Sequence, residues 1–447
     1  MNNTREYKEL SKVSWLGSIP AEWDAKKIGS LFSQRKTKVS DKDFPPLSVS
    51  KAGVVPQLST ALKTNDGDNR KLVRAGDFVI NSRSDRKGSC GIAKEDGSVS
   101  LINIVLTPRG NWDERYIHYL LRSQPFSEEY YRYGRGIVAD LWTTRYSEMK
   151  NIVLPIPSID EQKKIGQYLD WQVSKINKLI SSMKTQISLL KEQEHVALRR
   201  IVFEGIDRHS EGVQKTGLPW IEEVPASWKR LRIKNLLQSK KQIVGEDSSK
   251  HVLLSLTTGG IIERDVESGK GKFPSDFSSY QLVDKGDFVF CLFDVDETPR
   301  TVGLSNLNGM ITGAYDVFTT NFRNPAYLFY YFLCIDDEKA LKPYYSGLRK
   351  VVKQDVFLRL PIFIPSDDEQ DEIVKRADAI IQSSKKAQDI LNNEIEALNE
   401  LRSRLVADVV LGRKNVLEIE IPDYEYVDDE SCLDADDDSE GIEEQED

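Results

Sequence analysis

Two loops, one in each half of the sequence, carry charged side chains of the kinds that bind nucleic acids. The first loop follows a predicted strand and places Arg83, Arg86 and Lys87 among small hydrogen-bonding residues. Arginine binds guanine with two hydrogen bonds, whereas lysine and serine mostly contact phosphate. The corresponding loop of the second half, residues 293–300, ends in Arg300 but is otherwise acidic. Because carboxylates accept hydrogen bonds from cytosine amino groups, the two loops are not expected to bind the same bases.

The acidic loop has two other interpretations. Asp294, Asp296 and Glu297 are candidate ligands for a cation, although the fixed ligand spacing of an EF-hand is absent. A solvated surface loop is the third interpretation, and it applies to the basic loop as well. The sequence leaves these interpretations open.

A second group of candidate contacts lies before each of two long predicted helices. Glycines accompany the cations there, and glycine permits a close approach of the backbone to a phosphate. Aromatic residues in such segments, including Trp142, are more often core residues than stacking groups. The candidates are Arg135, Trp142 and Arg145 in the first half and Arg349, Lys350 and Lys353 in the second.

The chain that carries these loops is built from two copies of one unit. Three motifs occur twice in the same order, at offsets of 205, 210 and 208 residues: residues 15–23 and 220–228, 73–79 and 283–289, and 156–162 and 364–370. A period this long indicates a duplicated domain rather than a solenoid repeat. A protein with one unit built twice is expected to act on something that also has two parts.

Each copy begins with about 140 residues of short β-rich segments separated by Gly, Pro, Asn and Asp. One helix is predicted in each, at residues 115–122 and 326–333, so the globular units are expected to be α+β. A long helix follows each unit. Serine starts both helices, with glutamate three residues later, as in a capping box. These pairs are Ser158 with Glu161 and Ser366 with Glu369.

Apolar residues follow a heptad repeat in the first long helix, which is typical of a coiled coil. The second helix is less regular because Gln388 and Arg402 fall at seam positions, and Gly412 is a plausible stop. Each helix could also pack on its own domain. Their matched lengths favour pairing as an antiparallel coiled coil, with the globular units at opposite ends. The central seam positions are Ile176, Ile180, Met183, Ile187, Leu190, Leu391, Ile395 and Leu398.

The predicted domains are a first globular domain, a first long helix, a second globular domain, a second long helix and an acidic tail, at residues 1–157, 158–205, 206–365, 366–413 and 414–447. Sixteen acidic residues and no Lys or Arg occur from residue 418 onward, and without them the formal net charge of −9 becomes +7. The tail is therefore predicted to be disordered. It is interpreted as a solubilising extension or, alternatively, as a DNA mimic or partner-binding segment.

The motif search predicts no catalytic residue and no metal site. The sequence has no phosphate-binding GxxxxGK[ST] loop, no CxxC pair among four cysteines, and no metal-ligand spacing among four histidines. Residues 324–327, Asn-Pro-Ala-Tyr, are close to the tetrapeptide of amino-methyltransferases. They begin a duplicated helix, however, and capping by Asn324 with Pro325 in the first turn explains them. No signal peptide or bilayer-spanning run is found, and the cysteine usage fits the cytoplasm.

The repeated motifs and the alternation of globular unit and long helix carry a family resemblance over residues 13–413. The sequences Ile19–Trp23 and Val224–Trp228, and Leu154–Gln162 and Ile362–Gln370, carry most of it. The chain resembles the specificity subunit of Type I DNA restriction–modification systems. In two respects it departs from that pattern: Pro361 begins a different arrangement of prolines in the second copy, and the acidic tail has no counterpart.

The resemblance implies that each globular unit is a target recognition domain for one half of a bipartite double-stranded DNA site. It implies that the helices set the spacing and dock two methyltransferase subunits, with restriction/motor subunits as further partners. The chain itself is then a non-catalytic part of an adenine-specific methyltransferase/endonuclease complex. No cofactor is expected on this chain, and S-adenosylmethionine, Mg and ATP are expected on partner subunits. The competing interpretation is a coiled-coil scaffold whose globular units bind protein or RNA.

Overall fold

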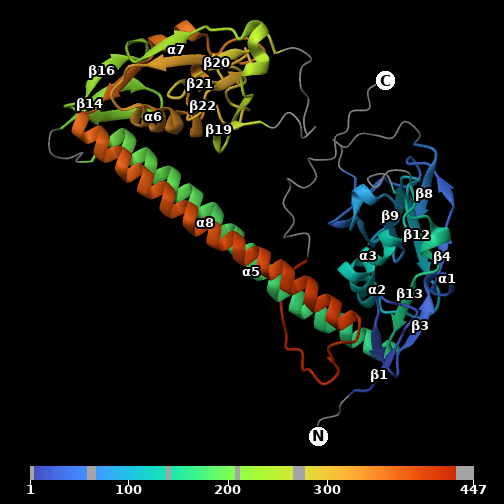
Figure 1. Cartoon of the computed structure of the whole chain (residues 1–447). Coiled ribbons are helices and arrows are strands. Elements are labelled where there is room, and N and C mark those ends of the chain that lie inside the picture. The colour runs from blue at the N-terminus through green and yellow to red at the C-terminus, as the bar shows by residue number, and fades with distance from the viewer. Residues whose placement is uncertain (1–4, 58–66, 137–141, 207–211, 265–276, 429–447) are drawn as a thin grey trace. The chain divides into compact units, whose positions relative to one another are not determined.

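The computed structural model describes residues 5–57, 67–136, 142–206, 212–264 and 277–428 (Figure 1). The chain forms two compact units. Unit 1 comprises residues 1–185 and 391–447, and unit 2 comprises residues 186–390. Each unit contains one globular α+β domain and a stretch of both long helices, α5 (Ile159–Glu204) and α8 (Asp367–Val410). The predicted fold class, two α+β domains each followed by a long helix, is confirmed.

The globular domain of unit 1 is built around a four-stranded antiparallel sheet in the order β10-β9-β12-β4. Its central strand β9 is buried along its whole length, as its apolar sequence predicts. A three-stranded sheet, β11-β8-β5, lies in the same domain. The strands are β1 (Tyr7–Glu9), β2 (Ser18–Pro20), β3 (Asp24–Lys27), β4 (Phe32–Arg35), β5 (Lys38–Val39), β6 (Leu47–Ser50), β7 (Gly53–Pro56), β8 (Arg70–Val73), β9 (Phe78–Asn81), β10 (Cys90–Ile92), β11 (Gly97–Val99), β12 (Asn103–Pro108) and β13 (Val153–Ile156).

The same domain has more helix than the sequence predicted. In place of one helix at 115–122 there are two in succession, α2 (Glu114–Arg122) and α3 (Gln124–Arg132), besides the short α1 (Ile28–Leu31) and α4 (Tyr146–Met149). Ser123 separates α2 from α3, and its hydroxyl accepts a hydrogen bond from the Phe126 amide. Pro125 lies in the first turn of α3, where proline is favoured. The Ser-x-Pro segment therefore ends one helix and starts the next.

The globular domain of unit 2 repeats the main sheet of unit 1, with the order β17-β24-β21-β22. Its main helix is α6 (Pro325–Asp337), and Asn324 accepts a hydrogen bond from the Tyr327 amide at its start, so the predicted cap is confirmed. The remaining elements are β14 (Val213–Leu218), β15 (Ile221–Pro225), β16 (Lys229–Arg232), β17 (Leu237–Lys240), β18 (Leu254–Thr257), β19 (Gly260–Glu263), β20 (Gln281–Val283), β21 (Phe288–Phe290), β22 (Val302–Leu304), β23 (Gly309–Ile311), β24 (Asp316–Thr320), α7 (Gln354–Arg359) and β25 (Pro361–Ile364).

The first and third repeated motifs meet at the joint between each globular domain and its helix. In unit 1 the Trp23 indole donates to the Glu161 carboxylate over 2.8 Å, and the guanidinium of Arg5 pairs with the same carboxylate. In unit 2 the Trp228 indole donates to Glu369 over 3.2 Å. The two glutamates therefore do not complete a capping box, because each side chain is turned to a tryptophan. The serine half of the predicted box is present, since the serine hydroxyls accept from the Glu161 and Glu369 amides.

The long helices pair in an antiparallel arrangement, as predicted. In unit 1, Leu169 near the start of α5 shares a core with Val409 near the end of α8. In unit 2, Val202 near the end of α5 shares a core with Ile373 near the start of α8. One irregular seam position has a polar partner: the Arg402 guanidinium donates to the Asn177 side-chain oxygen over 2.8 Å. A partly buried polar pair of this kind specifies the register of paired helices.

The acidic tail is ordered over its first part, which corrects the prediction of disorder for residues 414–428. After α8 the chain turns at Gly412, which has a φ of 73°. Val416 is buried in the core of unit 1, and Val427 is hydrogen-bonded to α5. The prediction failed because it weighed charge alone, whereas apolar residues alternate with the acidic ones here. Residues 429–447 lie outside the described residues.

Candidate nucleic-acid interface

In unit 1 the two candidate loops, distant in sequence, lie against each other. The Ser84 amide donates to the Trp142 carbonyl and the Thr144 amide donates to the Ser82 carbonyl, each over 2.9 Å. Thr143 also forms isolated β-bridges with Arg83 and Arg135. Backbone hydrogen bonds fix loops more firmly than side-chain contacts, so these segments form one structural element. We call residues 82–88, 133–136 and 142–145 the unit 1 loop pair.

Most cations of the unit 1 loop pair face solvent. Arg86, Lys87 and Arg145 are exposed, and the Arg135 side chain is 81% exposed while it forms an ion pair with Glu148 at 3.8 Å. Arg83 is held by an ion pair with Asp85, with 2.8 Å between nitrogen and oxygen. Trp142 is 39% exposed, so it is not a core residue. The arrangement presents several cations and one aromatic face, which suits phosphate contacts and stacking.

In unit 2 the corresponding loops also meet. The Asp294 amide donates to the Arg349 carbonyl over 2.9 Å, and the Val352 amide donates to the Leu292 carbonyl over 2.7 Å. The Arg349 guanidinium lies 5.3 Å from the centre of the Phe293 ring. We call residues 292–298 and 346–353 the unit 2 loop pair. Two segments about 50 residues apart in sequence are thus again joined by backbone hydrogen bonds.

The unit 2 loop pair neutralises part of its own charge. The Lys350 ammonium pairs with Asp296 over 3.0 Å and also with Glu297. The hydrogen bonds from Lys350 to Glu297 and Asp296 raise the pKa of Lys350, and the hydrogen bond from Lys350 lowers the pKa of Asp296. Asp294 and Lys350 both have a φ of 45°, a region in which non-glycine residues are uncommon and which often marks a functional site.

Arg300 and Lys353 have different surroundings from the other candidates. The Arg300 guanidinium pairs with Asp336 over 3.2 Å and with Asp337 over 2.7 Å, and its side chain is only 18% exposed. Arg300 therefore connects its loop to α6 and is not brought together with the exposed cations. Lys353 is exposed at the N-terminus of α7. Nothing in these positions tests a DNA contact directly, so all ten candidates stay predictions.

The interpretation of the acidic loop as a cation site receives no support. Among the residues that the structure describes, no group of three or more His, Cys, Asp or Glu side chains is placed to hold a metal ion. Asp296 and Glu297 are instead directed at Lys350. In the described helices, moreover, none is long and apolar enough to cross a membrane.

The predicted seam residues differ in their burial. Ile176 and Ile180 are buried, and Met183, Ile187, Leu190, Leu391, Ile395 and Leu398 are partly buried. Other apolar side chains of the helices, outside the heptad seam, are about half exposed, and sequence reasoning missed them. They are Leu179, Leu189, Val196, Ile390 and Leu401. Their positions outside the heptad repeat could have predicted that these apolar side chains are exposed.

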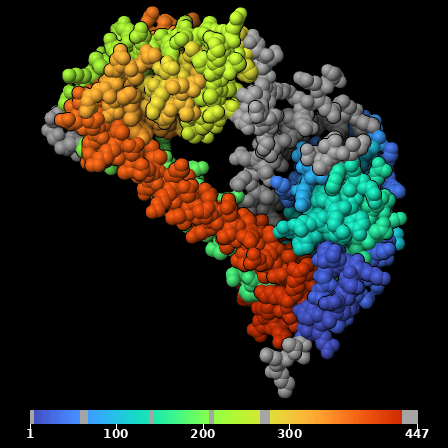
Figure 2. Space-filling view, in the orientation of Figure 1, coloured from blue at the N-terminus to red at the C-terminus, as the bar shows by residue number. Residues whose placement is uncertain are grey.

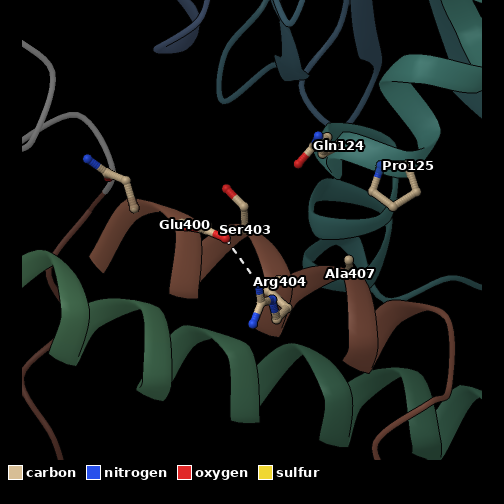
Figure 3. Close-up of a pocket in the computed structure, with 7 residues that line it drawn as sticks. Gln124, Pro125, Glu400, Ser403, Arg404 and Ala407 are labelled. Carbon is tan, nitrogen blue, oxygen red and sulfur yellow. Dashed lines mark hydrogen bonds and ion pairs between the residues drawn. The ribbon is translucent and has the colours of Figure 1, made fainter. Parts of the chain in front are cut away.

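A hollow of about 410 Å³ lies in unit 1 between α3 and the last turns of α8. Gln124 and Pro125 line it from α3, and Ser403 and Ala407 line it from α8 (Figure 3). An ion pair between Glu400 and Arg404, 3.0 Å apart, borders the hollow. The hollow is open and its lining mixes polar and apolar groups, which suits contact with another macromolecule more than enclosure of a small ligand.

Each of the two α+β domains presents a pair of joined loops and is connected to the paired long helices. Residues 20–189 match the family described as Type I restriction modification DNA specificity domain. This match covers less than half of the chain, and it confirms the resemblance to the specificity subunits of Type I restriction–modification systems.

Two curated relatives come from Methanocaldococcus jannaschii. The chain is 21% identical over 252 residues to the proposed type I restriction enzyme MjaX specificity subunit, covering 51% of the chain and 56% of the relative. It is 22% identical over 229 residues to the type I restriction enzyme MjaVIII specificity subunit, covering 49% of the chain and 50% of the relative. The chain thus spans about half the length of these relatives.

The fold is also similar to that of a solved chain from work on complex assembly and conformational transition of the type I R-M system. The TM-score is 0.60 at 14% sequence identity, and the match covers 88% of this chain and 98% of the other. At this sequence identity the similarity supports the fold alone, and no residue role or ligand is inferred from it.

Proposed function

We propose that this chain is the DNA-recognition subunit of a Type I restriction–modification complex and that each loop pair binds one half of a bipartite DNA site. One observation carries the proposal: in both units, two loops distant in sequence are joined by backbone hydrogen bonds and present charged side chains. The backbone geometry is shared, whereas the charges differ. Recognition of two different half-sites requires different side chains, and these can be presented on the same backbone arrangement.

The paired helices are proposed to set the distance between the half-sites and to dock two methyltransferase subunits. Continuous helices of 46 and 44 residues are suited to a spacer because a helix has a fixed rise per residue. Their half-exposed apolar side chains, such as Leu179 and Leu401, are suited to partner contacts. The orange and red surface of α8 is open to solvent on the face shown in Figure 2.

In this proposal the chain supplies recognition and no catalysis. Adenine methylation is assigned to the methyltransferase subunits, and S-adenosylmethionine, Mg and ATP to partner subunits. Restriction/motor subunits are proposed as further partners, and the cytoplasm as the location. The support is the family of residues 20–189 together with the absence of a catalytic motif from the sequence.

The test begins with mapping methylated adenines in cells with and without this chain. We expect one bipartite sequence to lose methylation when the chain is absent. Binding of that sequence by the purified chain with its methyltransferase is then measured in gel-shift competition. We expect insertion of one base pair between the half-sites to abolish the preference, because the helices fix the spacing. Equal affinity for all duplexes in the presence of the methyltransferase would contradict the proposal.

A matched insertion in the protein tests the helices as a spacer. Four residues added to both α5 and α8 near the boundary of the two units lengthen each helix by roughly 6 Å, which is nearly two base-pair steps. We expect the preferred spacer of the DNA site to lengthen by one or two base pairs while the half-sites stay the same. Insertion in α5 alone is the control, since it disrupts the pairing of the helices.

A further inference from the structure

The first part of the acidic tail is fastened along unit 1. After α8, the Lys414 ammonium donates to the Tyr168 hydroxyl over 2.7 Å and lies 5.2 Å from the centre of its ring. Val416 is buried in the same core as α2 and the start of α5, and Ile419 and Ile421 pack against it. Burial of these apolar side chains fixes the path of residues 414–421.

The following residues are held by hydrogen bonds to buried groups of α5. The Val427 amide donates to the Ser174 hydroxyl over 3.2 Å, and the Asn177 side-chain amide donates to the Val427 carbonyl over 3.2 Å. Asn177 is fully buried, and Ser174 is nearly so. Glu425 adds an ion pair with Lys178 at 3.0 Å. Because buried polar groups are costly when unpaired, this attachment is a specific one. We call residues 414–428 the anchor.

The anchor ends beside the recognition domain of unit 1. Asp428 pairs with Lys94 over 3.0 Å. Lys94 follows β10 and lies seven residues after Lys87 of the unit 1 loop pair, so at most about 25 Å of chain separates them. Residues 429–447 number nineteen and span at most roughly 65 Å. The remainder of the tail can therefore reach the exposed cations of that loop pair.

The charges of the two partners are complementary. Residues 429–447 contain eleven acidic residues and no Lys, Arg or His. The unit 1 loop pair exposes Arg86, Lys87, Arg135 and Arg145. The unit 2 loop pair already pairs Lys350 with its own carboxylates. The cationic surface next to the anchor is thus the more open of the two to an acidic segment.

We propose that residues 429–447 bind the exposed cations of the unit 1 loop pair and compete there with DNA phosphates. This inference rests on the proposed function and adds a means of regulating it. The anchor makes the competition intramolecular, so the local concentration of the acidic segment is high. Only a DNA that gains base contacts displaces the segment, and binding to unrelated DNA is suppressed. The effect is electrostatic and weakens as salt rises.

The first experiment compares the full chain with a chain that ends at Asp428, which keeps the anchor. The matched control keeps all 447 residues but replaces the eleven acidic residues of 429–447 by Asn or Gln. With the methyltransferase present, we expect both variants to bind a random-sequence duplex on the order of tenfold more tightly than the full chain at about 50 mM salt, with a steeper salt dependence. Equal affinity and equal salt dependence of the three proteins would overturn the proposal.

The second experiment needs no DNA and therefore separates this inference from the proposed function. Cys432 lies in the acidic segment, whereas Cys90, Cys291 and Cys334 are buried and burial raises the pKa of each thiol. A fluorophore is attached to Cys432 and its anisotropy is measured at low salt. We expect anisotropy to fall in the Arg86→Ala/Lys87→Ala variant and on addition of salt. Anisotropy that is the same in both proteins would overturn the inference, whatever the DNA-binding result.

Discussion

The two loop pairs share a backbone arrangement and differ in how their charges are satisfied. In unit 1 Arg86, Lys87 and Arg145 are exposed, whereas in unit 2 Lys350 is paired with Asp296 and Glu297. The joints between the globular domains and the long helices are alike. The Trp23 indole donates to Glu161 in unit 1, and the Trp228 indole donates to Glu369 in unit 2. The duplication thus preserved the groups that hold the domains on the helices, and the exposed side chains were left to diverge. The following predictions test this comparison.

The largest effect is expected at the joints. Glu161→Ala leaves the Trp23 indole without its acceptor and leaves the Arg5 guanidinium with Glu22 as its remaining partner, and we expect a loss of about 2–4 kcal/mol in the free energy of unfolding. Glu369→Ala leaves the Trp228 indole and the Ile206 amide without theirs, at about 1–2 kcal/mol. Urea denaturation measures both. Glu161→Gln is the control, since its amide oxygen still accepts from Trp23. Equal losses in the two units would show that the joints are energetically the same.

The next largest effect concerns the cations of unit 1. Arg86→Ala/Lys87→Ala is expected to weaken binding of any duplex about 10- to 100-fold at low salt and to reduce the salt slope by about one for each phosphate that these two side chains bind. Titration of a duplex at several salt concentrations measures both quantities. Lys26→Ala/Lys27→Ala, on β3 of the same domain, is the matched charge control. A weakening confined to one sequence, with an unchanged slope, would instead assign these residues to base recognition.

A smaller effect is expected from the ion pairs of unit 2. Lys350→Met leaves Asp296 and Glu297 as unpaired carboxylates facing the DNA, and we expect about a 5- to 10-fold loss of affinity. Adding Asp296→Asn and Glu297→Gln removes that repulsion and is expected to restore most of the affinity. A double-mutant cycle measures the coupling. If the triple variant binds as weakly as Lys350→Met, Lys350 contacts DNA itself and the two loop pairs are more alike than their ion pairs indicate.

The smallest effect is a pH dependence in unit 1. Burial raises the pKa of Asp170, although hydrogen bonding from Tyr119 and the charge of Arg115 act against it. The folded protein therefore holds this proton at higher pH than the unfolded chain does, and stability from this group falls as pH rises from about 4 through the raised value. Asp170→Asn is expected to gain stability relative to the wild type over that window. Denaturation of the wild type and of Asp170→Asn at several pH values checks it.

Much of the fold follows from short-range patterns, and the failures have identifiable causes. The long helices were predicted because their apolar residues repeat over many turns, and the start of α6 because Asn324 and Pro325 form a recognisable cap. The start of α3 was missed because Pro125 is compatible with both a helix end and a first turn. The capping-box prediction was right for the serines and wrong for the glutamates, because the glutamate carboxylates accept hydrogen bonds from tryptophans more than 130 residues away.

The candidate interface was also predicted only in part from the sequence. The sequence identified the loops, since cations, glycines and small polar residues gather there, but not which loops meet. That depended on backbone hydrogen bonds such as those joining Ser84 to Trp142 and Asp294 to Arg349. Arg300 was included because its type suited DNA, yet its guanidinium is held by Asp336 and Asp337. The anchor was missed because charge suggested disorder, whereas Val416 is buried.

The sequence by itself determined that the protein is one unit built twice, that long helices join the units, and that the two copies differ in the charge of their loops. These properties follow from residue types and their spacing, which determine local structure directly. Only the tertiary structure decided which loops form one surface, which charges are already paired, and that the first part of the acidic tail is fastened to α5. Those properties depend on contacts between residues far apart in the chain, and no local pattern encodes the partner of a buried polar group.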